Sequence, residues 1–300
     1  MDNLQEFRPA RQRGVILHAG ILLLLLAGSG ALLMLAMAQS SRGFFILYLV
    51  FSLVVFLPIP ILLYRLFALL KAKYVIDREG FHIQWGLRTE DIPMQEVEWL
   101  RLASDMPYEV PLPRLSVQGA ILGVIQTKDL GRLEFTASDS AQLVLIATRA
   151  KVLVISPADI ETFVYSFRHF SEMGSIAPIQ AASSNAEFLV TSLIKDKYVR
   201  SFIAGGIFLS IGLLTAVSFL IPMQTNIPLG FNPASGQLEP APSERLLLLP
   251  VAALFFLAAD VGVGSYLYRK QGFRTAAYLA FASALIIPLS FLLLVLLFVL

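Results

Sequence analysis

The sequence predicts a membrane protein with a bundle of five helical spans and an inserted soluble domain of about seven antiparallel strands and one closing helix. Two observations carry this fold class. The 300 residues are 57% hydrophobic and only 15% charged, a composition outside the range of ordinary soluble domains. The apolar residues also gather into five long runs, and a long polar interval with recurring turn residues separates the second run from the third.

Five runs are long enough to cross a bilayer as helices, which takes about 20 residues each. The first two, residues 15–38 and 44–63, predict a transmembrane hairpin. The other three are residues 202–221, 246–268 and 276–300. The apolar core of the first run exceeds the roughly 7 to 15 residues of a signal peptide, so we expect it to remain as a span.

Basic residues beside the spans predict the orientation, because cytoplasmic flanks accumulate Lys and Arg. One side receives nearly all of them, and the other side receives only Arg42 and Arg245. We therefore expect a multi-pass protein of the cell (plasma) membrane with its carboxyl terminus outside. The predicted parts are a cytoplasmic amino terminus (1–13), a transmembrane hairpin (14–70), a cytoplasmic domain (72–174), a linker (175–199) and three spans (200–300) with an external loop (222–245).

Alternating segments within residues 74–170 predict a half-open β-barrel closed by one helix. The first hairpin joins "YVID" to "FHIQW" through "REG", where Gly80 is expected to take a positive φ. The closing helix is expected after Ser156 as N-cap, with Pro157 in the first helical position and Asp159 in the first turn. The remaining strands are expected at "EVEWLRLA", "AILGVIQT", "RLEFTAS", "LVLIAT" and "KVLVIS".

These strands and the closing helix resemble the bacterial pleckstrin-homology (PH) domain, as found in uncharacterised multi-span membrane proteins. The segments "IPMQEV" and "VISPADIETF" carry most of the resemblance. It implies a PH-like fold, and this fold serves lipid, peptide and protein binding alike. Eukaryotic PH domains that bind phosphoinositides place several basic residues around the first hairpin, whereas here Arg78 stands between Asp77 and Glu79. The turn therefore does not favour phosphoinositide binding.

Composition excludes several classes of chemistry. The formal net charge of +2 gives no basic stripe for nucleic acid, and the absence of cysteine excludes thiolate nucleophiles and cysteine-based metal sites. His18, His82 and His169 have no metal-ligand spacing, and no nucleophile, base and stabiliser come together in the sequence. We expect no metal, no cofactor and no enzyme activity.

Asp260 is the one acidic residue deep in an apolar run, where an ionised carboxylate costs about 2.5 to 3.5 kcal/mol on insertion scales. Counting along antiparallel helices places Ser210 and Ser283 at a similar depth, where both could donate hydrogen bonds to it. Two interpretations stay open for these three residues. They form a proton or cation site of a transporter or membrane sensor, or Asp260 pins three helices together.

The leading hypothesis is a non-enzymatic membrane protein whose PH-like domain is an interaction or assembly module. Its partners would be the lipid bilayer around the spans and a protein partner or second copy at the domain. Binding is expected at exposed strand edges, at loops or on the face beside the closing helix. The exposed proline-rich segment 107–115 is expected to be an ordinary strand connection, with a peptide-like binding surface as the alternative.

Overall fold

A computed structural model describes residues 4–39, 41–114, 116–175, 179–184, 193–231, 238–270 and 272–298 of the chain. The chain forms two compact units, which are described separately. The first unit combines Met1–Met34 with Leu49–Ala186, and the second combines Leu35–Tyr48 with Glu187–Leu300. Parts of the predicted linker (176–178 and 185–192) and of the predicted external loop (232–237) lie outside the described residues.

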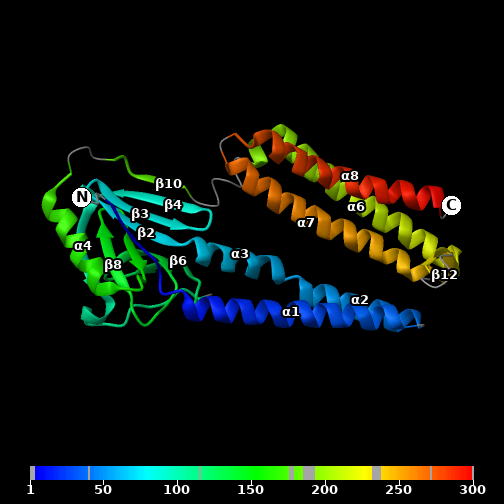
Figure 1. The fold of residues 1–300 in the computed structure, drawn as a ribbon, viewed down its shortest axis with the longest axis horizontal. Coiled ribbons are helices and arrows are strands. Elements are labelled where there is room, and N and C mark those ends of the chain that lie inside the picture. Colours follow the sequence, from blue (N-terminus) through cyan, green and yellow to red (C-terminus); the bar gives the residue numbers. More distant parts are fainter. Residues whose placement is uncertain are drawn as a thin grey trace. The chain divides into compact units, whose positions relative to one another are not determined.

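Five helices are long and apolar enough to cross a membrane, which confirms the predicted number of candidate spans among the described residues (Figure 1). The second span is interrupted at Pro58, because α2 ends at Phe56 and α3 begins at Ile59. Proline removes a backbone donor and clashes with the preceding turn, which breaks the helix there. The membrane helices are α1 (Gln12–Ala38), α2 (Arg42–Phe56), α3 (Ile59–Lys71), α6 (Lys197–Met223), α7 (Leu248–Arg269) and α8 (Arg274–Phe298).

The domain between the second and third candidate spans contains two five-stranded sheets with strands added from its flanks. The first has the order β1-β2-β3-β4-β10 with antiparallel pairs throughout. Its strands are β1 (Leu4–Phe7), β2 (Lys73–Asp77), β3 (Gly80–Trp85), β4 (Arg88–Pro93) and β10 (Ala182–Ser184). Both edge strands come from segments outside the predicted domain, so the chain covers the outer sides of β2 and β4 with its own flanks.

The second sheet has the order β5-β8-β9-β7-β6, with β5 and β6 as its edges among the described strands. The pair β7–β9 is parallel, and the other pairs are antiparallel. The strands are β5 (Val97–Leu102), β6 (Ile121–Thr127), β7 (Gly131–Ala137), β8 (Val144–Thr148) and β9 (Val152–Ile155).

The predicted barrel and its all-antiparallel pairing are wrong, because the two sheets share no strand and stay open. Hairpin signals identify neighbours such as β6–β7 and β8–β9, but they do not specify how one hairpin pairs with the next. β4 was also missed, since "RTEDIP" carries three charges and ends in proline. Its charged side chains have partners inside the domain.

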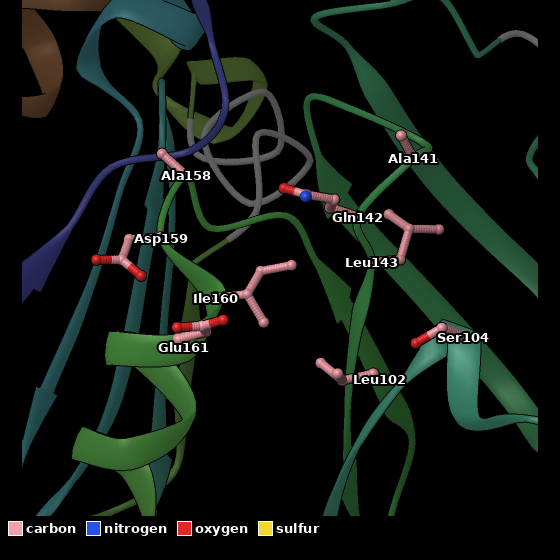
Figure 2. Close-up of a pocket in the computed structure, with 9 residues that line it drawn as sticks. All are labelled: Leu102, Ser104, Ala141, Gln142, Leu143, Ala158, Asp159, Ile160 and Glu161. Atoms are coloured by element: carbon pink, nitrogen blue, oxygen red, sulfur yellow. The ribbon is translucent and has the colours of Figure 1, made fainter.

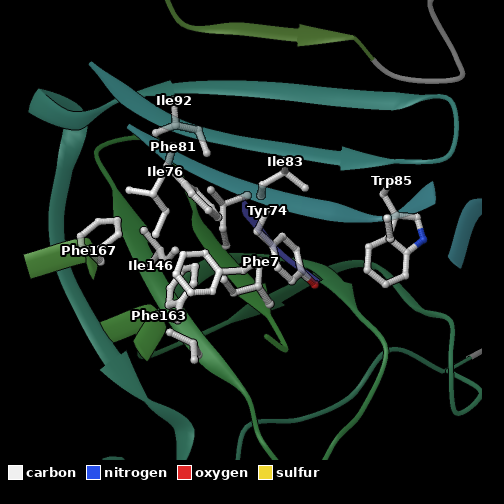
Figure 3. Packing of buried hydrophobic residues seen from close by; sticks show 14 of the residues in the cluster. Phe7, Tyr74, Ile76, Phe81, Ile83, Trp85, Ile92, Ile146, Phe163 and Phe167 are labelled. Atoms are coloured by element: carbon white, nitrogen blue, oxygen red, sulfur yellow. The ribbon is translucent and has the colours of Figure 1, made fainter. Parts of the chain in front are cut away.

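A shared apolar core joins the first sheet, the second sheet and α4 (Ile160–Met173), as Figure 3 shows. Phe163 of α4 meets Phe7 and Phe81 edge to face, with ring centroids 5.2 and 5.9 Å apart. Such aromatic pairs stabilise by about 0.5–1.5 kcal/mol beyond the area that they bury. Tyr74 of β2 donates its hydroxyl to Thr136 O of β7 at 2.7 Å, and burial raises the pKa of this phenol.

Two local expectations in the domain are also wrong. α4 begins after Asp159, whose carboxylate accepts from Thr162 N at 3.1 Å, so Asp159 is the N-cap. Ser156, the predicted N-cap, is buried and accepts instead from Ser138 N at 2.7 Å. Gly80 does not have a positive φ. It is required for a close approach, because an added Cβ would lie 2.5 Å from Ile92 O.

The second unit is built on the packed helices α6, α7 and α8. Small residues allow their backbones to approach closely, the usual packing mode in lipid. A Cβ added at Gly206 of α6 would lie 2.6 Å from Ala284 O of α8. The segment after α6 contains a hairpin of β11 (Asn226–Phe231) and β12 (Leu238–Pro242), where the sequence predicted a loop.

Candidate functional site

The β2–β3 turn is the place where a phosphoinositide site would be sought, and its charged groups are already engaged. Asp77 Oδ1 accepts from the backbone amides of Glu79 and Gly80, both at 2.8 Å. Arg78 donates through Nε to Gly174 O at 2.6 Å and through Nη2 to Met173 O at 3.1 Å. The guanidinium therefore caps the carboxyl end of α4 and directs two of its donors away from any phosphate.

The chain after α4 also packs on this turn. Ser175 donates its hydroxyl to Glu79, and Ile179 lies beside Gly80, where a Cβ would come 2.5 Å from Ile179 Cδ1. The turn thus presents the carboxylates of Asp77 and Glu79 and is covered in part by its own chain. Multivalent phosphate needs several free cationic donors, which this arrangement does not offer.

His82 of β3 lies between two carboxylates on neighbouring strands. Its Nδ1 is 2.7 Å from Asp91 Oδ1, and its Nε2 is 3.2 Å from Asp77 Oδ2. The two ring nitrogens point in opposite directions, so these three side chains do not converge on one point. No group of three or more His, Asp or Glu side chains within the described residues is arranged to hold a metal ion.

Four charged side chains form a buried cluster between the two sheets. Arg88 of β4 contacts Glu90 and Glu134, both at 2.5 Å, and Lys151 contacts Glu134 at 2.7 Å and also Glu90. Burial alone would raise the pKa of Glu134, but the Lys151 hydrogen bond and the charges of Arg88, Lys151 and Arg132 together lower it. The cluster balances two cations against two anions, and we interpret it as an electrostatic connection between the sheets.

A cavity of about 530 Å³ opens at the amino end of α4 (Figure 2). Asp159 and Glu161 contribute carboxylates to it, and the Thr162 hydrogen bonds lower the pKa of Asp159. These acidic groups occupy the helix end that would otherwise attract an anion. The other lining residues are Leu102, Ser104, Ala141, Gln142, Leu143, Ala158 and Ile160.

A groove of about 230 Å³ runs between the edge strand β5 and the second half of α4. β5 pairs with β8 on one side only, and its register shifts between Val97 and Trp99. An edge strand offers unpaired backbone N–H and C=O groups on its other side. The groove combines apolar and charged side chains, namely Val97, Glu98, Trp99 and Leu100 of β5 and Phe167, Arg168, Ser171 and Glu172 of α4.

The structure places the predicted intramembrane residues on three different helices. Asp260 of α7 is half-buried, and its Oδ2 has no hydrogen-bond partner among the described residues. Ser210 of α6 is buried, and its Oγ likewise has no partner among them. Ser283 of α8 donates its single O–H to Ala280 O at 2.7 Å. The hydrogen bonds expected from the two serines to Asp260 are therefore not formed.

Asp196 is a polar centre that the sequence did not reveal. It caps α6 through Tyr198 N at 3.0 Å and accepts from the hydroxyls of Tyr268 and Tyr278 at 2.9 and 2.7 Å. Burial alone would raise its pKa, but the hydrogen bonds from Tyr278 and Tyr268 and from the backbone amides of Val199 and Tyr198 lower it. Asp196 thus joins α6 to α7 and α8 at one end of the bundle.

The fold and these surfaces define a membrane protein with five candidate spans and a two-sheet domain closed by a helix. Residues 72–169 match the family described as Bacterial PH domain, which confirms the resemblance seen in the sequence. The match extends from just before β2 into α4. The chain therefore carries a bacterial PH domain between its second and third candidate spans. No curated protein and no solved structure matches the chain.

Proposed function

We propose that this protein is a non-enzymatic membrane protein whose PH domain binds a protein segment, from a partner or from a second copy, at β5. The observation that carries the proposal is the free edge of β5 beside an open groove along α4. An extended segment can add to such an edge through backbone hydrogen bonds, and groove side chains then select among segments.

The other edges of the domain support this choice. β1 and β10 belong to the chain's own flanks and cover the outer sides of β2 and β4. The proline-rich segment lies along β6, since a Cβ at Gly123 would come 3.2 Å from Pro113 Cβ. Two described strands of the PH domain itself remain as edges, β5 and β6. Because β6 faces the proline-rich segment across a cavity, we assign binding to β5 beside the α4 groove.

The charged groups of the β2–β3 turn support protein binding over phosphoinositide binding. Arg78 caps α4, and Asp77 and Glu79 add negative charge next to it. To bind a phosphoinositide at this turn, Arg78 would have to break its hydrogen bonds to the carbonyls of Met173 and Gly174. The bound phosphate would still lie next to the carboxylates of Asp77 and Glu79.

Site-specific photo-crosslinking in cells tests the proposal. A photoreactive residue at Glu98, which is exposed on β5, is expected to give a discrete protein adduct or a crosslinked dimer of this chain. The same residue at Tyr165, which is 72% exposed on α4 and does not line the groove, is the matched control. Equal adduct yields at the two positions, or none at Glu98, would contradict the proposal.

A second candidate function is a transporter or membrane sensor that uses Asp260. The unpartnered Oδ2 of Asp260 and Oγ of Ser210 favour it, because a buried carboxylate without a partner is stabilised by binding a proton or a cation. Asp260→Asn keeps the shape and removes the charge. Ser265→Ala is the control on the same helix, because Ser265 Oγ donates to Val261 O at 2.6 Å and belongs to no part of this site. If every ion- or pH-dependent phenotype survives Asp260→Asn, this candidate fails.

A further inference from the structure

Hydrogen bonds join the PH domain to the residues before α1 and place the loop before β6 against the start of α1. Ala10 N donates to Ser156 O at 3.0 Å, and Ser138 Oγ donates to Ala10 O at 3.0 Å. Gly119 N donates to Ser138 O at 2.6 Å, so Ser138 holds both the entry to α1 and the loop before β6. Figure 1 shows this loop beside the start of α1.

Backbone packing fixes the position of the loop against α1. A Cβ added at Gly14 would lie 2.3 Å from Gly119 Cα, so the two backbones touch. A Cβ at Gly119 would come 3.2 Å from His18 Cε1, one turn further along α1, and His18 is buried. The loop therefore covers the face of the first turns of α1 that carries Gly14 and His18.

These first turns lie at the headgroup level of the membrane. At about 1.5 Å per residue, the apolar run 15–38 is roughly 36 Å long, compared with about 30 Å for a hydrocarbon core. The excess is roughly one helical turn, and the exposed Arg13 directly before the run anchors this end among the headgroups. A loop resting on Gly14 and His18 is consequently held at the lipid interface.

The exposed side chains near this contact include three apolar ones and one cation, beside the neutral Gln118 and Gln126. Leu112, Val117 and Val124 are 41%, 37% and 52% exposed. Leu112 and Val124 line opposite sides of a cavity of about 570 Å³ between the proline-rich segment and β6. Arg114 lies between Leu112 and Val117 in the sequence and is exposed. It forms no ion pair within the described part of the chain.

The geometry points to a membrane-contact surface of the PH domain, formed by Leu112, Arg114, Val117 and Val124, that rests on the lipid leaflet where α1 enters the bilayer. The apolar side chains contact the acyl boundary, and Arg114 reaches lipid phosphate in the way that basic side chains do at membrane interfaces. The loop that carries Val117 rests through Gly119 on the start of α1, where Ile16 and Leu17 are exposed, and this neighbouring apolar helix surface is why lipid is the proposed occupant. The membrane-contact surface is separate from the β5 groove.

The absence of cysteine from the chain allows a direct test with single-cysteine variants of the full-length protein. Val117→Cys, Val124→Cys and Tyr165→Cys are labelled with an environment-sensitive fluorophore and reconstituted into nanodiscs. Part of the lipid carries a spin label near the headgroup. Tyr165 is the control, because α4 lies away from the start of α1 in Figure 1.

We expect blue-shifted emission and quenching by the spin-labelled lipid at Val117 and Val124, and neither effect at Tyr165. Quenching at Val117 and Val124 no greater than at Tyr165 would overturn the inference. A blue shift without quenching would indicate a protein neighbour at this surface and would overturn it equally. Val117 lies in a loop and Val124 lies in a strand. If one label distorts its surroundings, the other position still gives an independent measurement.

Discussion

Replacing Lys151 tests the charged cluster as the connection between the two sheets of the PH domain. Lys151→Met keeps much of the aliphatic side chain but leaves Glu90 and Glu134 with Arg88 alone. Glu90 and Glu134 are only 3% and 5% exposed at their side chains, and Lys151 is 19% exposed. The variant therefore leaves one excess negative charge in a buried site.

Removing one partner of a buried ion pair typically costs 3–5 kcal/mol. Arg88 stays 2.5 Å from both carboxylates and compensates in part, so we expect the lower end, about 3 kcal/mol. For a domain of roughly 100 residues, each kcal/mol lowers the Tm by about 4–8 °C, which predicts a drop of at least about 12 °C.

Intrinsic fluorescence reports this domain within the full-length protein, because Trp85 and Trp99 are the two tryptophans of the chain and both lie in its strands. Lys128→Met is the matched control, since Lys128 is exposed in the turn between β6 and β7. Its effect should stay within about 0.5 kcal/mol. A Lys151→Met variant that unfolds at the same temperature as Lys128→Met would refute the structural role of the cluster.

Three further predictions concern pH, helix packing and the start of α4. The pKa of Glu134 in the folded protein lies below its usual value of 4.5. Glu134 therefore contributes its full stabilisation above pH 4.5 and loses it as the pH falls through the folded pKa. An acid titration followed by tryptophan fluorescence should show this loss of stability, and Glu134→Gln should abolish it. Gly206→Ala should lower the stability of the protein in detergent, whereas Gly212→Ala should not, because the space around its Cβ position is open. Equal SDS unfolding curves for the two variants would contradict the close packing at Gly206. Asp159→Ala should lower the Tm through loss of the N-cap, and Ser156→Ala should lower it through loss of the buried Ser138–Ser156 hydrogen bonds. An unchanged Tm in Asp159→Ala would contradict the N-cap assignment.

Local signals in the sequence predicted the elements of the PH domain better than their pairing. The hairpins β2–β3, β6–β7 and β8–β9 follow from alternation and turn residues within each segment. The parallel pair β7–β9 and the order of the two sheets depend on contacts between hairpins, for which the chain has no local signal. The strands β1 and β10 have only four and three residues, too few for a readable alternation.

Buried polar groups were the main feature that the sequence did not reveal. Arg88, Glu90, Glu134 and Lys151 are spread over some sixty positions, and alternation alone places such residues on the solvent face. Asp196 resembles an ordinary helix cap until the fold brings Tyr268 and Tyr278 to it. The acidic character of the β2–β3 turn was readable, whereas the use of Arg78 as a cap for α4 required the fold.

Hydrogen–deuterium exchange at β5 tests the central claim most directly. The protein is isolated with its crosslink-identified partner, or as a dimer, and compared with the same protein stripped of that partner. If a segment adds to β5, the outward-facing amides of residues 97–102 should exchange more slowly in the complex, while those of residues 121–127 on β6 should not change. Unchanged exchange at β5 in a complex that is demonstrably intact would contradict the account.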